Sequence, residues 1–149
     1  MNQAANLIVR HARAEDAERI SALIAQLGFD APPATLSARL MALARQGLPC
    51  LIAEADEIVG CVSLSVMTVL HRPLPVGRIS MLVVASGWRG RGVGRALVEQ
   101  AIDLLREAGC GLCEVTSNLA LVEAHAFYEK LGFGATSLRL ARSIEVSGS

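Results

Sequence analysis

The sequence predicts a single α/β domain in which one layer of mixed sheet is covered by helices. Its 149 residues suit one domain, and 52% hydrophobic against 19% charged residues provide enough apolar surface for a core. Apolar positions recur at helical spacing in some segments and alternate in others, in the order β-α-α-β-β-β-α-β-α-β. Because strands and helices do not alternate regularly, a repeating doubly wound fold is not expected. The length of the chain predicts that residues 1–149 form one domain.

The first half of the chain is expected to form a strand, two helices and two further strands. Residues 7–13 alternate weakly, as strands do, and residues 15–27 repeat apolar positions at helical spacing before Gly28. Thr35 follows a proline break and is the expected N-cap of a second helix, which ends at Gly47. Two strands follow at residues 50–55 and 58–70, separated by a turn at Asp56-Glu57.

The second half is expected to contain a buried strand and a strong amphipathic helix. Residues 71–77 hold prolines and glycine and form a loop, and the strand at residues 78–85 is apolar on both faces near its end, as central strands are. Residues 93–108 keep one apolar stripe and end at Gly109, which predicts a helix. The last expected elements are a strand at residues 112–117, a helix at residues 119–131 and a strand at residues 137–142.

Charge and composition exclude several classes of protein. The chain balances 14 basic against 14 acidic residues, so its net charge gives no support for binding nucleic acid or an anionic membrane. The longest apolar stretch, residues 58–70, is well short of the roughly 20 residues that span a bilayer. The first residues lack the pattern of a signal peptide. We therefore expect a cytoplasmic protein that binds neither nucleic acid nor membranes.

The cysteines do not form a recognisable metal site. Cys110 and Cys113 have CxxC spacing, but a structural zinc site needs a second pair of ligands, and Cys50 and Cys61 are not spaced as one. Disulfides are not expected without an export signal. All four cysteines are therefore expected to be small buried hydrophobes, and no metal is expected.

The most informative segment leads from the strand at residues 78–85 into a glycine-rich turn that opens the next helix. The turn reads Arg89-Gly-Arg-Gly-Val-Gly-Arg95. Its glycines permit close approach of a ligand, and the free helix amides, the helix dipole and the arginines all favour a phosphate. The dinucleotide fingerprint fails because Arg95 stands at its third glycine, and the P-loop fails because Val93 stands where lysine is required.

This pattern resembles the pyrophosphate-binding motif of the GNAT superfamily of acyl-CoA-dependent N-acetyltransferases. The motif positions are Arg89, Gly92 and Gly94 after a strand. Residues 114–118, Glu-Val-Thr-Ser-Asn, and residues 124–133, Ala-His-Ala-Phe-Tyr-Glu-Lys-Leu-Gly-Phe, resemble the family's next strand and helix. The resemblance implies a mixed, mostly antiparallel central sheet with splayed central strands, flanked by about four helices.

The resemblance also implies direct transfer of an acetyl group from acetyl-CoA to a primary amine of a small molecule or peptide. The pantetheine arm would enter between the strands at residues 78–85 and 112–117, and an amide near Val83 would polarise the thioester oxygen. The residues implied to bind CoA are Leu82, Val83, Val84, Arg89, Gly90, Arg91, Gly92, Val93, Gly94, Arg95 and Asn118.

Tyr128, the only tyrosine, matches the position of the family's general acid. A phenol, with a pKa of about 10, is protonated at neutral pH and can donate to the departing thiolate. The alternative is a core aromatic residue beside Phe127 and Phe133. The strand before the turn lacks the acid that many members carry, so the general base stays open among Glu114, Glu54, His71 and none.

Two other classes of function remain to be compared with the enzyme. A non-catalytic CoA-binding sensor or interaction protein of the same fold is consistent with the missing strand acid. A nucleotide-binding module would need a partner for a base or ribose, and none is found. The family also implies a homodimer, to which the strand at residues 137–142 would contribute. The sequence does not identify the amine acceptor, because no acidic cluster marks a polyamine or aminoglycoside pocket.

Overall fold

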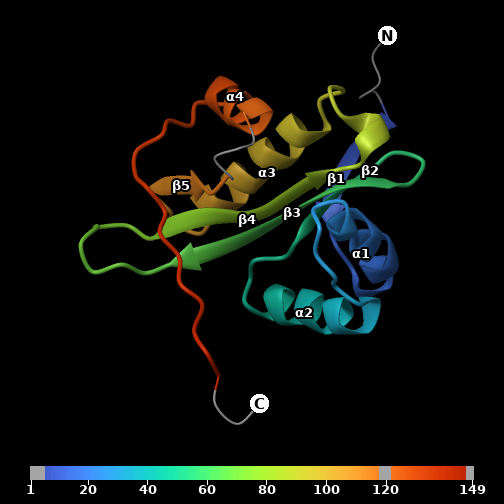
Figure 1. Cartoon of the computed structure of the whole chain (residues 1–149), viewed down its shortest axis with the longest axis horizontal. Helices are drawn as coiled ribbons and strands as arrows, with labels where there is room; N and C mark the ends of the chain where they lie inside the picture. The colour runs from blue at the N-terminus through green and yellow to red at the C-terminus, as the bar shows by residue number, and fades with distance from the viewer. Residues whose placement is uncertain (1–5, 118–121, 147–149) are drawn as a thin grey trace. The chain divides into compact units, whose positions relative to one another are not determined.

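The computed structural model describes residues 6–117 and 122–146, and the chain divides into two units, Met1–Val115 and Thr116–Ser149 (Figure 1). The first unit contains a five-stranded sheet in the order β1-β2-β3-β4-β5. Neighbouring strands from β1 to β4 are antiparallel, and β5 pairs with β4 in parallel, which confirms the mixed, mostly antiparallel sheet. The strands are β1 (Ile8–His11), β2 (Leu51–Glu54), β3 (Ile58–Met67), β4 (Val76–Val84) and β5 (Leu112–Val115).

Among the described residues, three α-helices belong to the first unit and one to the second, which agrees with the predicted number of about four. They are α1 (Ala17–Ala25), α2 (Pro33–Arg45), α3 (Val93–Glu107) and α4 (Val122–Lys130), with 3₁₀ turns η2 (Ala14–Asp16) and η3 (Ser86–Trp88). Among the residues that the structure describes, no helix is both long and apolar enough to cross a membrane.

Helix α3 packs closely on one face of the sheet because two strand glycines lie beneath it. A Cβ atom on Gly60 would come within 2.9 Å of the side chains of Val93 and Leu97, and one on Gly77 within 2.7 Å of Leu105. Helices α1 and α2 contact each other, and α1 contacts β3 from the opposite face (Figure 1). The largest fully buried side chains come from both layers and from the sheet, and they include Ile20, Leu23, Ile52, Leu64, Ile79, Leu97 and Leu105.

Most strand and helix boundaries differ from the prediction by a few residues, as in β4, which begins at Val76 inside the predicted loop at residues 71–77, and one predicted strand is absent from the described residues. Helix α2 begins at Pro33 rather than after Thr35, because proline suits the first helical position, where its missing N–H has no partner to lose. Strand β3 ends at Met67, three residues before the predicted end at Leu70. Residues 137–142 do not form a strand. Their alternation is real, with Leu138 and Leu140 exposed, but a strand needs a neighbour for its backbone hydrogen bonds.

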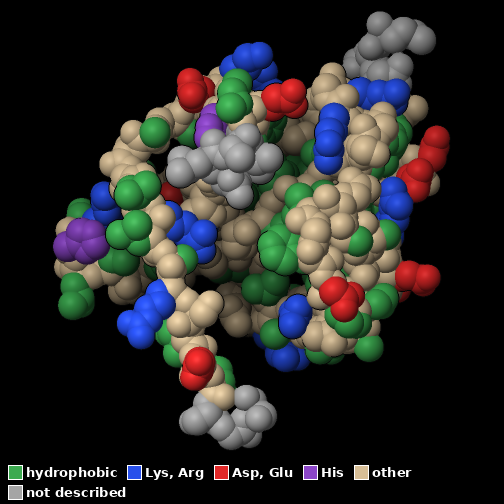
Figure 2. Space-filling view, viewed as in Figure 1, with side chains coloured by type: hydrophobic (Ala, Val, Ile, Leu, Met, Phe, Trp, Pro, Cys, Tyr) green, Lys and Arg blue, Asp and Glu red, His purple; other side chains and the backbone are tan. Residues whose placement is uncertain are grey.

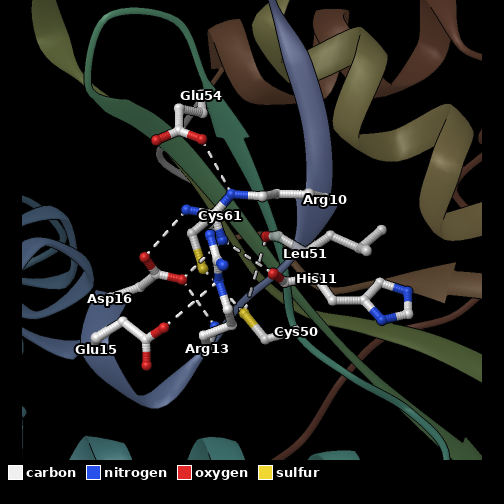
Figure 3. Close-up of polar contacts among 9 residues, drawn as sticks. All are labelled: Arg10, His11, Arg13, Glu15, Asp16, Cys50, Leu51, Glu54 and Cys61. Carbon is white, nitrogen blue, oxygen red and sulfur yellow. Dashed lines mark hydrogen bonds and ion pairs between the residues drawn. The ribbon is translucent and has the colours of Figure 1, made fainter.

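An arginine-centred network joins β1, β2 and η2 (Figure 3). Arg10 donates from Nη1 and Nη2 to the two carboxylate oxygens of Asp16 at 2.9 and 3.1 Å, and from Nε to Glu54 at 3.0 Å. Asp16, which is only 8% exposed, also accepts the backbone N–H of Arg13 at 2.7 Å. The hydrogen bonds from Arg10 lower the pKa of Asp16 and offset the cost of its burial.

This network predicts an acid-dependent loss of stability. Because the folded state lowers the pKa of Asp16, the ionised carboxylate stabilises the fold above its unfolded pKa of about 4. That contribution is lost as the pH falls through the folded pKa. Asp16→Asn should therefore cost about 1–3 kcal/mol at pH 7 and less at pH 3, by urea unfolding at both values. The exposed pair partner Asp103 supplies the control Asp103→Asn, and an equal cost of Asp16→Asn at both values would contradict the prediction.

The cysteines follow the prediction only in part. Cys50 and Cys61 are buried, with their sulfur atoms 3.1 Å apart, and the hydrogen bond between them and their burial raise the pKa of Cys61 (Figure 3). Cys110 and Cys113 are half-buried rather than buried. Burial raises the pKa of the Cys113 thiol to about 11 and also raises the pKa of Cys110, a direction that disfavours the thiolate form.

Candidate functional site

Strand β4 has an open edge where it separates from β5. The two strands pair only between residues 76–79 and 112–115, whereas β3 accompanies β4 as far as Val84. Residues 80–84 therefore have no sheet partner on the β5 side within the described part of the chain. This is the predicted splay of the central strands, and Leu82, Val83 and Val84 all lie on the open stretch.

A β-bulge begins this open stretch. In the register between β3 and β4, Ser63 lies opposite Met81 and Leu64 opposite Ile79, which leaves Ser80 as an extra, exposed residue. Bulges re-aim side chains and end regular pairing, and they are frequent beside functional sites. The bulge changes which side chains of β4 face α3, and it coincides with the point where β5 leaves the sheet.

The glycine-rich turn places unpaired amides at the start of α3. Gly90 and Gly92 have φ angles of +77° and +86°, which side-chain-bearing L residues rarely adopt, and nothing lies within 4 Å of a Cβ built on either. Gly92 is the N-cap of α3, and no side chain caps the helix. The first helical bond joins the N–H of Ala96 to the carbonyl of Gly92 at 3.1 Å. The amides of Val93, Gly94 and Arg95 precede it, so they are available to an anion.

The three arginines around this turn differ in their partners. Arg89 and Arg91 are exposed and form no ion pair with any described residue, so their charges are available. Arg91 lies over the ring of Trp88, with its guanidinium carbon 4.9 Å from the ring centroid. Arg95 donates from Nε to Glu99 at 3.0 Å on the exposed side of α3. The turn therefore combines free amides with two available cations, which is the chemistry that phosphate requires.

An arginine that the sequence reasoning missed lies at the end of the paired stretch. Arg78 is beside Glu114 in the parallel register of β4 and β5, and its Nε and Nη2 donate to Glu114 Oε1 at 2.9 and 2.6 Å. An arginine at the start of the otherwise mostly apolar segment 78–85 was the available signal. Of the three candidate bases, Glu114 alone lies where β4 and β5 part. Glu54 is bound to Arg10 on β2, and His71 lies exposed in the loop before β4.

The second unit positions Tyr128 among aromatic rings. The ring of Tyr128 meets Phe127 edge-on at 5.1 Å and Phe133 edge-on at 5.6 Å between centroids. Helix α4 is followed by Gly132 at a φ angle of +93°, and the N–H of Phe133 then donates to the carbonyl of Tyr128 at 3.0 Å. This turn returns Phe133 to Tyr128. The general-acid role stays a prediction, and Asn118 lies outside the described residues.

Within the described ranges, no three His, Cys, Asp or Glu side chains gather closely enough to hold a metal ion. The first unit offers the backbone amides of the turn and open edge, the arginines around the turn and the Arg78–Glu114 pair.

Comparison with known proteins agrees with this arrangement. Residues 23–133 match the acetyltransferase (GNAT) family. The chain is 29% identical to the aminoalkylphosphonate N-acetyltransferase of Salmonella typhimurium, over 91% of this chain and 90% of that protein. It resembles a solved acetyltransferase of Trypanosoma brucei with a TM-score of 0.78 and 26% identity, covering 93% and 99% of the two chains. An aminoglycoside N-acetyltransferase solved with CoA has the same fold, with a TM-score of 0.82 at 19% identity and 94% and 95% coverage.

Proposed function

Because this chain belongs to the GNAT acetyltransferase family, we propose that it transfers an acetyl group from acetyl-CoA directly to a primary amine of a small molecule or peptide. The observation that carries the proposal is the open edge of β4, which leads through η3 into the uncapped start of α3. An extended backbone edge suits the amide-bearing pantetheine arm, and the helix start suits a pyrophosphate. The edge of β4 and the start of α3 follow one another in the first unit. They would bind the pantetheine arm and the pyrophosphate of CoA, respectively.

In this proposal the backbone of Leu82, Val83 and Val84 hydrogen-bonds the pantetheine arm. The pyrophosphate is bound by the turn residues Arg89, Gly90, Arg91, Gly92, Val93, Gly94 and Arg95. Val93 contributes only its amide, because its side chain is buried under the sheet. Asn118 contributes a side-chain contact to the arm. The two groups of residues suit the two parts of CoA, because backbone amides form hydrogen bonds with the neutral amides of the pantetheine arm and arginines bind phosphates.

The reaction then needs three groups from the protein. The amine attacks the thioester carbonyl, and an amide near Val83 stabilises the oxyanion that forms. Tyr128 donates its proton to the departing CoA thiolate when the carbon–sulfur bond breaks. Glu114 accepts the proton that the amine loses. Its position favours it over the other candidate bases, because it lies at the point where β4 and β5 part.

Binding and turnover test the proposal separately. Acetyl-CoA at about 100 times its dissociation constant should add about 2.7 kcal/mol of stability, measured as a thermal shift. Thiol release with a broad panel of primary amines measures transfer. Binding without thiol release from any amine would favour the non-catalytic CoA sensor. No thermal shift at millimolar acetyl-CoA would exclude both functions, and a shift with ATP that matches the shift with CoA would indicate a nucleotide-binding module.

We also propose that residues 1–149 act as one cytoplasmic domain and that the protein is a homodimer. The apolar positions Leu138, Leu140 and Ile144 are 70%, 84% and 86% exposed, in a segment without regular structure. Extended apolar segments of this kind gain hydrogen bonds and burial by pairing with a strand of another copy. Sedimentation at micromolar concentration should show a dimer, and a monomer of 15.7 kDa would contradict this prediction.

A further inference from the structure

We infer that Arg78 and Glu114 recognise an acceptor that carries an anionic group, carboxylate or phosphate, within a few bonds of its amine. The inference rests on the proposed function and specifies the acceptor. Arg78 would bind the anion of the acceptor, and Glu114 would bind its ammonium group. The acceptor would thereby be held beside the open edge of β4, where the thioester is expected.

The geometry of the pair leaves one guanidinium nitrogen and one carboxylate oxygen without a partner among the residues that the structure describes. Both hydrogen bonds from Arg78, at 2.9 and 2.6 Å, end on the same oxygen, Oε1 of Glu114. Within the described residues, Nη1 of Arg78 and Oε2 of Glu114 have no partner. The two side chains are 33% and 38% exposed, so a ligand can reach them. A guanidinium fork and a carboxylate side by side match the two charges of a zwitterion.

The other strand arginine of this sheet is used differently. Arg10 contacts both oxygens of Asp16, which is 8% exposed and also bonded to a backbone N–H, and its Nε reaches Glu54. That network gives both oxygens of a buried carboxylate a partner and joins three elements. Arg78 joins only two strands that already pair there, and it leaves half of its partner carboxylate unused. A purely structural role therefore explains Arg10 better than Arg78.

The surroundings of the pair are polar and uncovered by the first unit's helices. Because Gly77 faces α3, the alternation of the strand places Arg78 on the opposite face, where its neighbour on β3 is Ser65. Helix α1 reaches the beginning of β3, where Arg19 donates to the carbonyl of Ile58. The far end of the β3–β4 hairpin extends away from α1 and α2 (Figure 1). Ser65 and the exposed Ser80 thus add hydroxyl groups to an open surface.

The charge distribution makes this local pair important for selectivity. Figure 2 shows acidic and basic side chains interspersed over the visible face, without a large region of one sign. Since the chain also has no net charge, we assign selection of the acceptor's charges to local pairs of side chains. An amine without an anion can bind Oε2 of Glu114, but it leaves Nη1 of Arg78 without a partner. An acceptor with both charges satisfies both side chains, so the pair discriminates in its favour.

Matched acceptors and arginine variants test the inference. β-Alanine is compared with its amide, and O-phosphoethanolamine with ethanolamine, so that each pair differs in the anion. For each acceptor, kcat/KM of the variant is divided by that of the wild type, which cancels differences in amine basicity. For Arg78→Gln, this ratio should fall for one or both anion-bearing acceptors, and the fall should be about 10- to 100-fold larger than for the matching neutral amine. Arg78→Lys keeps the positive charge and should restore part of the loss. Arg106→Gln removes an exposed arginine paired with Asp103 on α3 and should change no ratio.

Each outcome decides the inference. Equal losses for both members of both pairs, or wild-type preference for the neutral amines, would overturn it while leaving the proposed acetyl transfer intact. A loss confined to the phosphate pair or the carboxylate pair supports it and identifies the anion. If no amine releases thiol, the proposed function fails. The recognition of zwitterionic amines by Arg78 and Glu114 is then tested by titration calorimetry with O-phosphoethanolamine and β-alanine. Binding that Arg78→Gln abolishes supports the recognition site, and no binding to the wild type overturns it.

Discussion

Tyr128→Phe is expected to lower turnover by about 10²–10⁴, the usual contribution of a general acid. The substitution keeps the ring and its edge-on contacts with Phe127 and Phe133, and it removes only the hydroxyl group. If that hydroxyl protonates the leaving thiolate, the loss belongs to the transition state. The dissociation constant of acetyl-CoA should then change little. Turnover is measured by thiol release with the best amine of the panel, and acetyl-CoA affinity by titration on the same preparation.

The opposing role for Tyr128 is packing, and it has a different signature. Removal of a structural hydroxyl costs at most about 1 kcal/mol of unfolding free energy and leaves turnover of the folded protein near normal. Phe127→Leu serves as the packing control, because it disturbs the same aromatic cluster without touching a hydroxyl. A stability loss with normal turnover in both variants would end the general-acid assignment.

Gly92→Ala should weaken acetyl-CoA binding by about 10- to 100-fold, through the loss of charge-assisted hydrogen bonds from the helix start. Gly92 has a φ angle of +86° at the N-cap of α3, and the proposed pyrophosphate lies against this backbone. A methyl group there obstructs close approach and favours a different backbone conformation. Arg91→Ala removes one exposed charge of three and should weaken binding much less.

The same helix supplies the matched control for this variant. Gly109 follows the other end of α3 with a φ angle of +87°, and nothing lies within 4 Å of a Cβ built on it. Gly109→Ala therefore introduces equal backbone strain without touching the proposed site, and both variants should lose about 1 kcal/mol of stability. Acetyl-CoA titration of both variants separates strain from binding. Equal affinities in Gly92→Ala and Gly109→Ala would show that the turn does not bind the cosubstrate.

Local features of the structure were predictable because their causes lie within a few residues of one another. Helix α3 follows from an apolar stripe between Gly92 and Gly109, and both glycines adopt the left-handed conformation that their positions suggest. The glycine-rich turn is likewise a short segment whose glycines, amides and arginines are adjacent in sequence, and its binding of an anion stays a prediction. The sequence places the start of α2 three residues too late, because Thr35 is a favourable cap, whereas in the structure Pro32 is the N-cap and Pro33 is the first helical residue.

Features that depend on strand register required the tertiary structure. Arg78 and Glu114 are 36 residues apart, and they meet only because β5 pairs with β4 in parallel at that register. The bulge at Ser80 exists only relative to β3, and alternation within β4 does not reveal it. Residues 137–142 show the converse case. Their alternation is suitable for a strand, yet the chain provides no neighbour for them among the described residues, and a strand is formed by its partner as much as by its own sequence.

The amino-acid sequence by itself determined the family, and it located the glycine-rich turn and Tyr128 as the candidate phosphate site and candidate acid, because a motif is a local arrangement of chemical groups. Only the tertiary structure decided where the strands separate, which carboxylates already have partners and which arginine is left with a free donor. Glu54 and Glu114 are equivalent as letters, but long-range pairing joins the buried network of Arg10 to Glu54, and joins the half-exposed Arg78 to Glu114 close to where β4 and β5 part. The physical reason is that hydrogen bonding and exposure are properties of residues brought together from distant parts of the chain.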